Sequence, residues 1–357
     1  MAFKIQKADL MEGMKVAKKV IGRSAAKIAD AEVELAESDG GMTLRACFPG
    51  LCYLGWNVPG KGSAGFDRLV VPLDKLRGLV DRMPAEEISV RIDPKNDERL
   101  RLKCGQRSGL IPIRQEPMAF KEIGDDAELT HEGEMKPLSQ AIRLFDKVSL
   151  KGFNAWGCVC AAPDGTGYAT DEGNMIVVPF PLVEKCDHPV MLPTKVLVPA
   201  TMLTGDVEVY LTDKQLCIKN SRWTYLVVTT YVKAPNYERV IGQFTPHERA
   251  PIDIDSITKE VRDFRKACKD GALTMRSQGG VLSVIATRDA SISYKSERDV
   301  GDSPNFELSV IPENYMKVGP SFKKGTEVAI VDGSHLFLMN GDQSGIVSCI
   351  AGTIKFS

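Results

Sequence analysis

The chain has 357 residues, of which 43% are hydrophobic and 26% are charged, a balance typical of a soluble globular protein. Its formal net charge of −1 excludes a global attraction to nucleic acid or anionic membranes, so any such attraction must come from charges segregated on one surface. No apolar run approaches the ~18 residues of a membrane span. The N-terminus opens on a strand-like alternation rather than a secretory signal, so a cytoplasmic protein is expected.

The first predicted elements are a helix near the start of the chain, a second helix opened by Pro72, and a hairpin. The apolar stripe of the first helix has the spacing of a helix that lies against a sheet. Alternating apolar residues at 88–92 and 100–102, separated by a turn, predict the hairpin. The residues of the stripe are Leu10, Met14, Ala17 and Ile21.

The same elements recur twice further along the chain. Pro193 and Pro312 follow Pro72 at steps of about 120 residues, and each precedes a hairpin pattern, at 207–218 and 328–338. A repeat of this length has the size of a whole domain. The sequence therefore predicts an α+β protein, built as three tandem copies of one domain with two helices on antiparallel sheets. The apolar stripes of the two later first helices are Leu138, Ile142 and Phe145, and Ile257, Val261, Phe264 and Cys268.

Two polar segments, 121–127 and 242–249, combine turn-forming and charged residues and are interpreted as joints between the domains. The predicted domains are residues 1–124, 125–244 and 245–357. Asp9 and Asp255 lie near the starts of the first and third of these helices, where a carboxylate is expected to cap free N–H groups. The nine cysteines are scattered along the chain, which favours buried, reduced thiols.

Basic residues occupy equivalent positions on all three first helices. At about 100° per residue, these positions project away from the sheet. A charged exposed face is ordinary on a single helix, but the same basic pattern on three helices, in a chain of net charge −1, favours a surface that faces a polyanion. No base-reading motif accompanies it, which indicates sequence-independent, salt-dependent contact with phosphates. The six residues are Lys15, Lys19, Arg143, Lys147, Arg262 and Lys266, and Lys151 extends the face.

The sequence contains no recognisable catalytic or metal-binding motif. None of the four histidines has metal-ligand spacing with a cysteine or another histidine. The glycine-rich segment 60–65 does not match a phosphate loop, and no nucleophile elbow is present. No metal, cofactor or catalytic residue is therefore predicted, although an enzyme of unrecognised type stays open as an alternative.

Two short segments carry a resemblance to a known family. The segments are Tyr168-Ala169-Thr170-Asp171 and Pro235-Asn236-Tyr237-Glu238-Arg239-Val240-Ile241. In both, and more weakly over the whole chain, the sequence resembles the β subunit of bacterial DNA polymerase III, the sliding clamp. The resemblance implies a non-catalytic processivity factor of DNA replication that forms a head-to-tail homodimeric ring around duplex DNA, in the cytoplasm of a bacterial or phage-infected cell. It also places Arg23 at a DNA-contacting position, with a solvated loop arginine as the alternative.

The resemblance further implies a hydrophobic pocket that binds short peptides of the polymerase and the clamp loader. This chain departs from the family there, because Glu172-Gly173-Asn174-Met175 stands where the family has Gly-His-Arg-Leu. The departure leaves open a second hypothesis, a scaffold of clamp fold with altered partner specificity, and it suggests a phage or mobile-element clamp. The expected pocket residues are Ala155, Thr170, Asn174, Met175, Pro235, Arg239, Val240, Cys349, Ile350 and Ala351.

Overall fold

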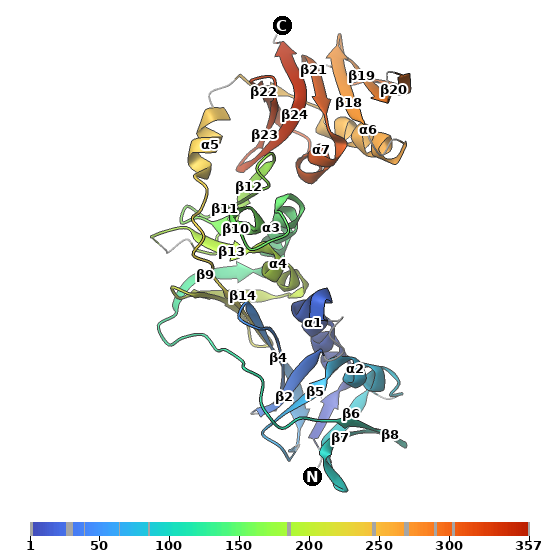
Figure 1. Ribbon diagram of the computed structural model, residues 1–357, viewed down its shortest axis with the longest axis vertical. Coiled ribbons are helices and arrows are strands. Elements are labelled where there is room, and N and C mark those ends of the chain that lie inside the picture. The colour runs from blue at the N-terminus through green and yellow to red at the C-terminus, as the bar shows by residue number, and fades with distance from the viewer. Residues whose placement is uncertain are drawn as a thin grey trace. The chain divides into compact units, whose positions relative to one another are not determined.

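The structure is a computed structural model. It describes residues 3–25, 31–38, 40–63, 65–84, 86–183, 187–244, 248–267, 271–288, 291–301 and 304–355. The chain packs as two compact units, Met1–Ser139 with Val196–Thr230, and Gln140–Lys195 with Tyr231–Ser357. The limits of these ranges fall inside two helices, α3 (Met135–Val148) and α4 (Thr194–Leu197). Figure 1 labels the elements along the chain. The predicted domains 1–124, 125–244 and 245–357 stay a prediction, because the two compact units have different limits.

The first unit is built on one 12-stranded antiparallel sheet, in which the strands follow the order β8-β7-β6-β1-β4-β16-β15-β14-β9, with β2, β3 and β5 off this path. Its helices are α1 (Lys7–Ala25), α2 (Leu73–Asp81) and the 3₁₀ turn η2 (Val198–Met202). Its strands are β1 (Phe3–Gln6), β2 (Glu32–Ser38), β3 (Gly41–Phe48), β4 (Cys52–Lys61), β5 (Arg68–Pro72), β6 (Glu87–Asp93), β7 (Asn96–Cys104), β8 (Arg107–Pro112), β9 (Glu128–Glu134), β14 (Asp206–Leu211), β15 (Gln215–Lys219) and β16 (Trp223–Val228).

The second unit also contains one 12-stranded antiparallel sheet, in the order β13-β10-β11-β12-β24-β21-β18-β19-β20, with β17, β22 and β23 off this path. Its helices are α5 (Tyr237–Phe244), α6 (Ile254–Ala267), α7 (Pro312–Val318) and the 3₁₀ turns η1 (Ala155–Gly157) and η3 (Gly319–Ser321). Its strands are β10 (Cys158–Ala161), β11 (Thr166–Thr170), β12 (Met175–Pro179), β13 (Val190–Pro193), β17 (Ala250–Pro251), β18 (Ala272–Gln278), β19 (Val281–Arg288), β20 (Ser291–Asp299), β21 (Asn305–Val310), β22 (Glu327–Val331), β23 (His335–Asn340) and β24 (Gln343–Lys355).

The order of elements along the chain repeats three times, as the proline spacing predicts. A strand and a first helix are followed by several strands, a second helix and more strands, and the first helices are α1, α3 and α6. The three predicted hairpins are β6–β7, β14–β15 and β22–β23. Pro72 and Pro193 directly precede α2 and α4, and Pro312 is the first residue of α7. The predicted α+β fold class, with the same order of helices and strands three times along the chain, is confirmed.

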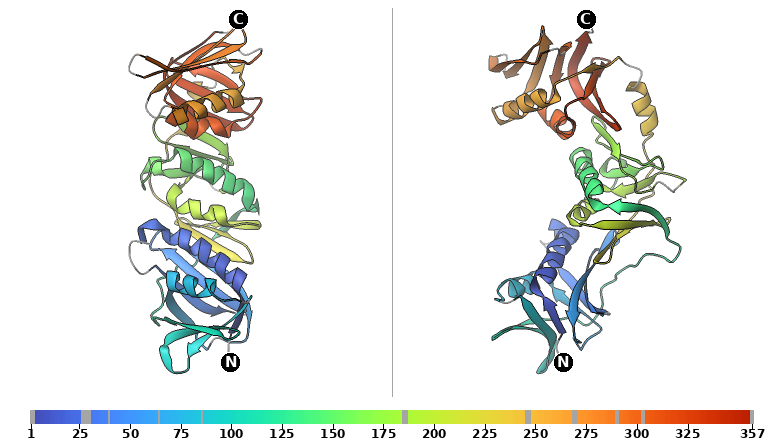
Figure 2. Two further views of the ribbon diagram at one scale, coloured as in Figure 1. Left: turned by 90° about the vertical axis from the view of Figure 1, so that its right-hand side faces the viewer. Right: turned by 180° about the vertical axis from the view of Figure 1, so that it is seen from behind.

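The apolar stripes of the first helices are buried, which holds each helix against its sheet. Leu10, Met14 and Ala17 are completely inaccessible on α1, which lies with α2 on one face of the first unit's sheet (Figure 2). A Cβ atom on Gly13 would lie 2.6 Å from Cδ1 of Trp56, so only glycine allows α1 to approach β4 this closely. The stripes of α3 and α6 are buried likewise, except that Cys268 lies outside the described residues.

The α6 helix starts differently from the expectation, because its capping residue is Asp253 rather than Asp255. Since the helix begins at Ile254, Asp253 precedes its first turn, and its Oδ1 accepts a hydrogen bond of 3.1 Å from the N–H of Ser256. Asp255 lies inside the first turn. At the start of α1, the carboxylate of Asp9 pairs with Arg222, 2.7 Å away.

The seven described cysteines are free thiols, and six of them are buried. Burial raises the pKa of the Cys158 and Cys160 thiols to about 11, so both stay protonated at neutral pH. No helix within the described ranges is long and apolar enough to cross a membrane.

Candidate functional site

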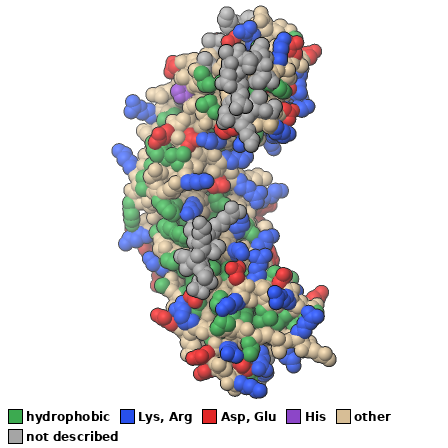
Figure 3. Space-filling model, turned by 45° about the vertical axis from the view of Figure 1, so that its right-hand side comes forward, with side chains coloured by type: hydrophobic (Ala, Val, Ile, Leu, Met, Phe, Trp, Pro, Cys, Tyr) green, Lys and Arg blue, Asp and Glu red, His purple; other side chains and the backbone are tan. Residues whose placement is uncertain are grey.

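The basic residues predicted on the first helices are exposed, and they lie opposite the buried stripes. Lys15 and Lys19 are exposed on α1, and Arg262 and Lys266 are exposed on α6. The α3 residues at the same positions, Arg143 and Lys147, are exposed too. Figure 3, turned toward the helices, shows many lysine and arginine side chains on the face it draws, with carboxylates among them.

Neighbouring carboxylates neutralise part of this basic surface. Lys266 pairs with Asp263 at 3.5 Å, and the adjacent Arg265 pairs with Glu313 at 3.3 Å. Lys15 and Lys147 make no ion pair with another residue in the described part of the chain. These exposed ammonium groups can contact an anion without breaking an ion pair within the described residues.

The two outer members of the predicted face differ from the others. Lys151 is exposed after the end of α3, where its charge interacts with that of Asp146. Arg23 follows Gly22, whose φ of +76° interrupts the helical geometry of α1, and its side chain lies outside the described residues.

A pocket of about 480 Å³ lies within the second unit, among η1, the β11–β12 turn, α5 and the edge of β23 and β24. It lies next to a buried cluster that includes Tyr168, Val177 and Phe337, against which Val240 of α5 packs. The residues that line the pocket are Trp156, Thr170, Glu172, Gly173, Asn174, Met175, Pro235, Val240, Gln243, His335 and Ile346.

Half of the pocket residues expected from the sequence line this cavity. They are Thr170, Asn174, Met175, Pro235 and Val240. Ala155 does not line it, because its neighbour Trp156 occupies that wall. Arg239 is exposed on α5 instead.

The C-terminal part of the expected set lies beyond the cavity. On β24 the lining residue is Ile346, three residues before Cys349, whereas Ile350 is 56% exposed. The side chain of Ala351 lies outside the described residues. The residues that sequence reasoning missed, Trp156, Gln243, His335 and Ile346 among them, carry no local signal of a pocket, although Trp156 adjoins the expected Ala155.

The Pro235–Ile241 segment is held against β11 by two tyrosines and a helix cap. The hydroxyl of Tyr168 donates a hydrogen bond to the carbonyl oxygen of Pro235, and the rings of Tyr168 and Tyr237 lie 4.4 Å apart. Asn236 Oδ1 accepts a hydrogen bond of 2.8 Å from the N–H of Arg239 and so caps α5. These contacts place Val240 and Gln243 at the pocket.

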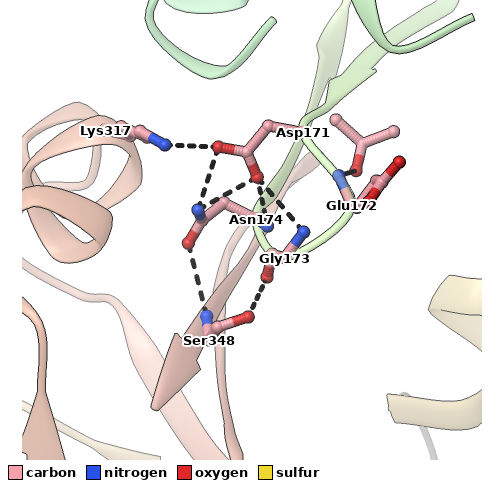
Figure 4. A network of polar contacts seen from close by, with 7 residues as sticks. Asp171, Glu172, Gly173, Asn174, Lys317 and Ser348 are labelled. Carbon is pink, nitrogen blue, oxygen red and sulfur yellow. Dashed lines mark hydrogen bonds and ion pairs between the residues drawn. The ribbon is translucent and has the colours of Figure 1, made fainter. Parts of the chain in front are cut away.

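The loop after Thr170 is organised by a buried carboxylate (Figure 4). Asp171 Oδ1 accepts hydrogen bonds from the N–H groups of Gly173, at 3.2 Å, and Asn174, at 2.7 Å. Its Oδ2 forms an ion pair with Lys317 of α7. Asn174 in turn accepts a hydrogen bond of 3.3 Å from the N–H of Ser348 on β24. The loop is therefore fastened to two other elements of the second unit.

These contacts set the charge of the loop. Burial alone would raise the pKa of Asp171, but the Lys317 ammonium and the groups of Asn174 outweigh it and hold that pKa below its ordinary value. Burial and the hydrogen bond to Asp164 raise the pKa of Tyr237 to about 12. Asp171 is thus ionised and Tyr237 neutral at pH 7. Among the described residues, no group of three or more His, Cys, Asp or Glu side chains could hold a metal ion.

No protein-family model and no curated protein matches the sequence. Solved structures do match: the DNA polymerase III β subunit of Borrelia burgdorferi, in complex with a natural product, has a TM-score of 0.83 at 12% identity, over 98% of this chain and 99% of that one. The Bacillus subtilis sliding clamp has a TM-score of 0.82 at 12% identity, over 98% and 99%. The Pseudomonas aeruginosa clamp bound to griselimycin has a TM-score of 0.81 at 16% identity, over 98% and 99%. The chain therefore has the fold of the sliding clamps.

Proposed function

We propose that this chain is a DNA sliding clamp, a non-catalytic processivity factor that encircles duplex DNA as a ring and tethers a replicative polymerase to it. The observation that carries the proposal is the clamp fold over 98% of the chain, together with exposed basic residues at equivalent positions of α1, α3 and α6. A bacterial cytoplasm, or that of a phage-infected cell, is the corresponding location.

The DNA contact proposed here is loose and independent of base sequence. Lysine and arginine side chains without base-reading partners contact phosphates, and such contacts weaken steeply as salt is added. Weak contact suits a ring that must slide. The residues assigned to it are Lys15, Lys19, Arg23, Arg143, Lys147, Lys151, Arg262 and Lys266.

Ring closure requires a head-to-tail homodimer, and each unit offers a sheet edge for it. In the described part of the chain, β8 pairs with β7 alone and β20 pairs with β19 alone. An open edge strand presents unpaired N–H and C=O groups that favour pairing with another chain. We propose that β8 of one protomer pairs with β20 of the next, so that two identical interfaces close the ring. Sedimentation at micromolar concentration is expected to give a dimer, and a monodisperse monomer would contradict it.

The pocket of the second unit is proposed to take short, mostly extended peptides of the polymerase and the clamp loader. Its volume of about 480 Å³ and its apolar lining, with Trp156, Met175 and Ile346, suit a few apolar side chains of such a peptide. The surrounding network of Asp171 and the cap of α5 hold the walls in place before binding.

Retention on DNA circles tests the topological role. The protein is loaded onto a nicked plasmid by a bacterial clamp-loader complex with ATP, separated from free protein by gel filtration, and the plasmid is then cut once. We expect the protein to stay on the circle at high salt and to run off after cutting. Equal retention on circular and linear DNA would refute topological binding.

A second candidate is a scaffold of clamp fold that does not serve the main replicase. It is favoured by the pocket loop, where Glu172 and Asn174 replace residues of the family pattern. Affinity for a standard polymerase clamp-binding peptide separates the two candidates. Binding in the low micromolar range supports the clamp, whereas no binding at high micromolar concentration, by a protein that is still retained on circles, supports the scaffold.

A further inference from the structure

The pocket of the second unit is apolar in character and has one acidic side chain at its rim. Trp156, Met175, Val240 and Ile346 supply apolar walls, and Glu172 is the only Asp, Glu, Lys or Arg among the lining residues. The formal charge carried by the lining residues is therefore negative.

The backbone of Glu172 is fixed by its neighbours. Its N–H donates a hydrogen bond of 3.3 Å to Thr170 Oγ1, and the next N–H, that of Gly173, donates to Asp171. The loop holds Glu172 at a φ of +77°, in the left-handed region that few residues with a side chain adopt. Figure 4 shows the Glu172 carboxylate pointing away from Asp171 and Ser348.

Glu172 makes no ion pair with any residue that the structure describes, although a cation lies close in the same loop network. Lys317 is engaged by Asp171 on the other side of the loop. The Glu172 side chain is exposed, so its four lone-pair positions are available to a ligand. An ionised carboxylate beside an apolar cavity is complementary to a guanidinium or ammonium group carried next to an apolar anchor.

We propose that the pocket selects partner peptides that carry arginine or lysine beside their apolar anchor residues, and that Glu172 is the residue that reads this cation. The inference rests on the proposed peptide-binding role of the pocket and adds the chemistry of the partner. It assigns to Glu172 a role in specificity, while the apolar walls supply most of the affinity.

The test uses three fluorescein-labelled octapeptides that share two leucines and differ at one position, which holds arginine, citrulline or glutamate. Citrulline has nearly the shape of arginine without its charge. Two series place the variable residue before and after the leucines. On the wild-type protein, fluorescence anisotropy is expected to give about threefold tighter binding of arginine than of citrulline in one series, as an ion pair with an exposed carboxylate provides.

Variants of Glu172 test whether this residue causes the preference for arginine over citrulline. In Glu172→Gln the ratio of the arginine and citrulline affinities is expected to fall to about one, and in Glu172→Lys the glutamate peptide is expected to bind best. Asp342→Asn removes an equal charge at the exposed β23–β24 turn of the same unit, outside the pocket, and should leave the ratio unchanged.

The inference is overturned if arginine and citrulline peptides bind the wild type equally, if no peptide binds, or if Glu172→Gln keeps the preference. None of these results bears on retention by DNA circles, which does not involve Glu172. Loss of that retention would instead count against the clamp itself, so the two failures are distinguishable.

Discussion

Asp171 is the residue on which the loop at the pocket rim depends. Its side chain is only 4% exposed, and it accepts hydrogen bonds from Gly173 and Asn174 while it pairs with Lys317. A buried carboxylate of this kind is stabilised only as long as every partner is present.

Removal of the Asp171 charge should destabilise the second unit. In Asp171→Asn, the partly buried Lys317 loses its counter-ion, and we expect a loss of about 2 kcal/mol in the free energy of unfolding at pH 7, because Lys317 keeps contact with water. The pKa of Asp171 is lowered in the folded state. Its contribution is therefore fully present above the unfolded pKa of about 3.9 and is lost as the pH falls through the folded pKa.

Urea denaturation from pH 7 to pH 3 measures this effect. The difference between wild type and Asp171→Asn should be constant down to about pH 4 and should shrink below it. Asp342→Asn, an exposed carboxylate at the β23–β24 turn, serves as the control and should differ little from wild type. A difference that does not change with pH would contradict the assignment.

Glu172 is held in a backbone conformation that glycine adopts more easily, with a φ of +77°. A residue with a Cβ atom in the left-handed region costs about 1–2 kcal/mol. The free energy of unfolding of Glu172→Gly should therefore be about 1 kcal/mol higher than that of Glu172→Ala. This difference already allows for the greater entropy of glycine in the unfolded chain, which acts in the opposite direction. Thermal unfolding of both variants checks this, and equal melting temperatures would show that the loop relaxes around the side chain.

At the scale of elements, α5 shows how a short helix forms one wall of a pocket. It has only 8 residues, a length that is marginal for an isolated helix, so its stability depends on its cap and its packing. Asn236 provides the cap, and the contact between the tilted rings of Tyr168 and Tyr237 holds the start of the helix to β11.

Loss of the α5 cap should weaken both the helix and peptide binding. Asn236→Ala is expected to destabilise α5 by about 1 kcal/mol, because the N–H of Arg239 loses its partner. Hydrogen exchange of the α5 amides should accelerate, and peptide affinity should fall because Val240 and Gln243 are less well placed.

Asn96→Ala is a matched control, since Asn96 accepts a similar hydrogen bond of 2.8 Å, from the N–H of Glu98, in the first unit away from the pocket. It should leave α5 exchange and peptide affinity unchanged. Unaltered exchange of α5 in Asn236→Ala would show that packing alone maintains the helix.

At the scale of the whole molecule, the proposed DNA contact depends on the sum of the charges on the basic helix faces. Each exposed lysine or arginine contributes little by itself, whereas phosphate contacts made together displace many counter-ions from DNA. Reversal of one charge on each first helix, in the triple variant Lys15→Glu, Arg143→Glu and Arg262→Glu, should abolish retention on DNA circles. Affinity for a short duplex at low salt should also fall and depend less steeply on salt.

A second triple variant separates helix-face charge from total charge. Lys95, Lys214 and Lys324 are exposed at turns and are not part of the first helices. Their reversal to glutamate changes the net charge by the same amount and is expected to leave retention on circles intact. Equal loss of retention in both triple variants would mean that net charge alone governs the DNA contact.

Local patterns determined most of what could be predicted. The period of the apolar residues defined α1, α3 and α6, and alternation around short turns defined the three hairpins, because both patterns depend on residues near one another in the chain. The same periodicity placed Lys15 and Arg262 on exposed faces. The α6 cap was missed by two residues, because Asp253 and Asp255 offer the same carboxylate and only the observed start of the helix distinguishes them.

The pocket was decided by the tertiary structure. Thr170, Pro235 and Ile346 lie far apart in the sequence, and only the pairing of β12 with β24 and the packing of α5 bring such residues to one cavity. The sequence by itself determined a threefold repeat with basic helix faces, since helix and strand periods are local. It could not determine that Glu172 stands in a left-handed conformation at the rim of an apolar pocket, because contacts of the loop with Lys317 of α7 and Ser348 of β24 join it to two distant elements.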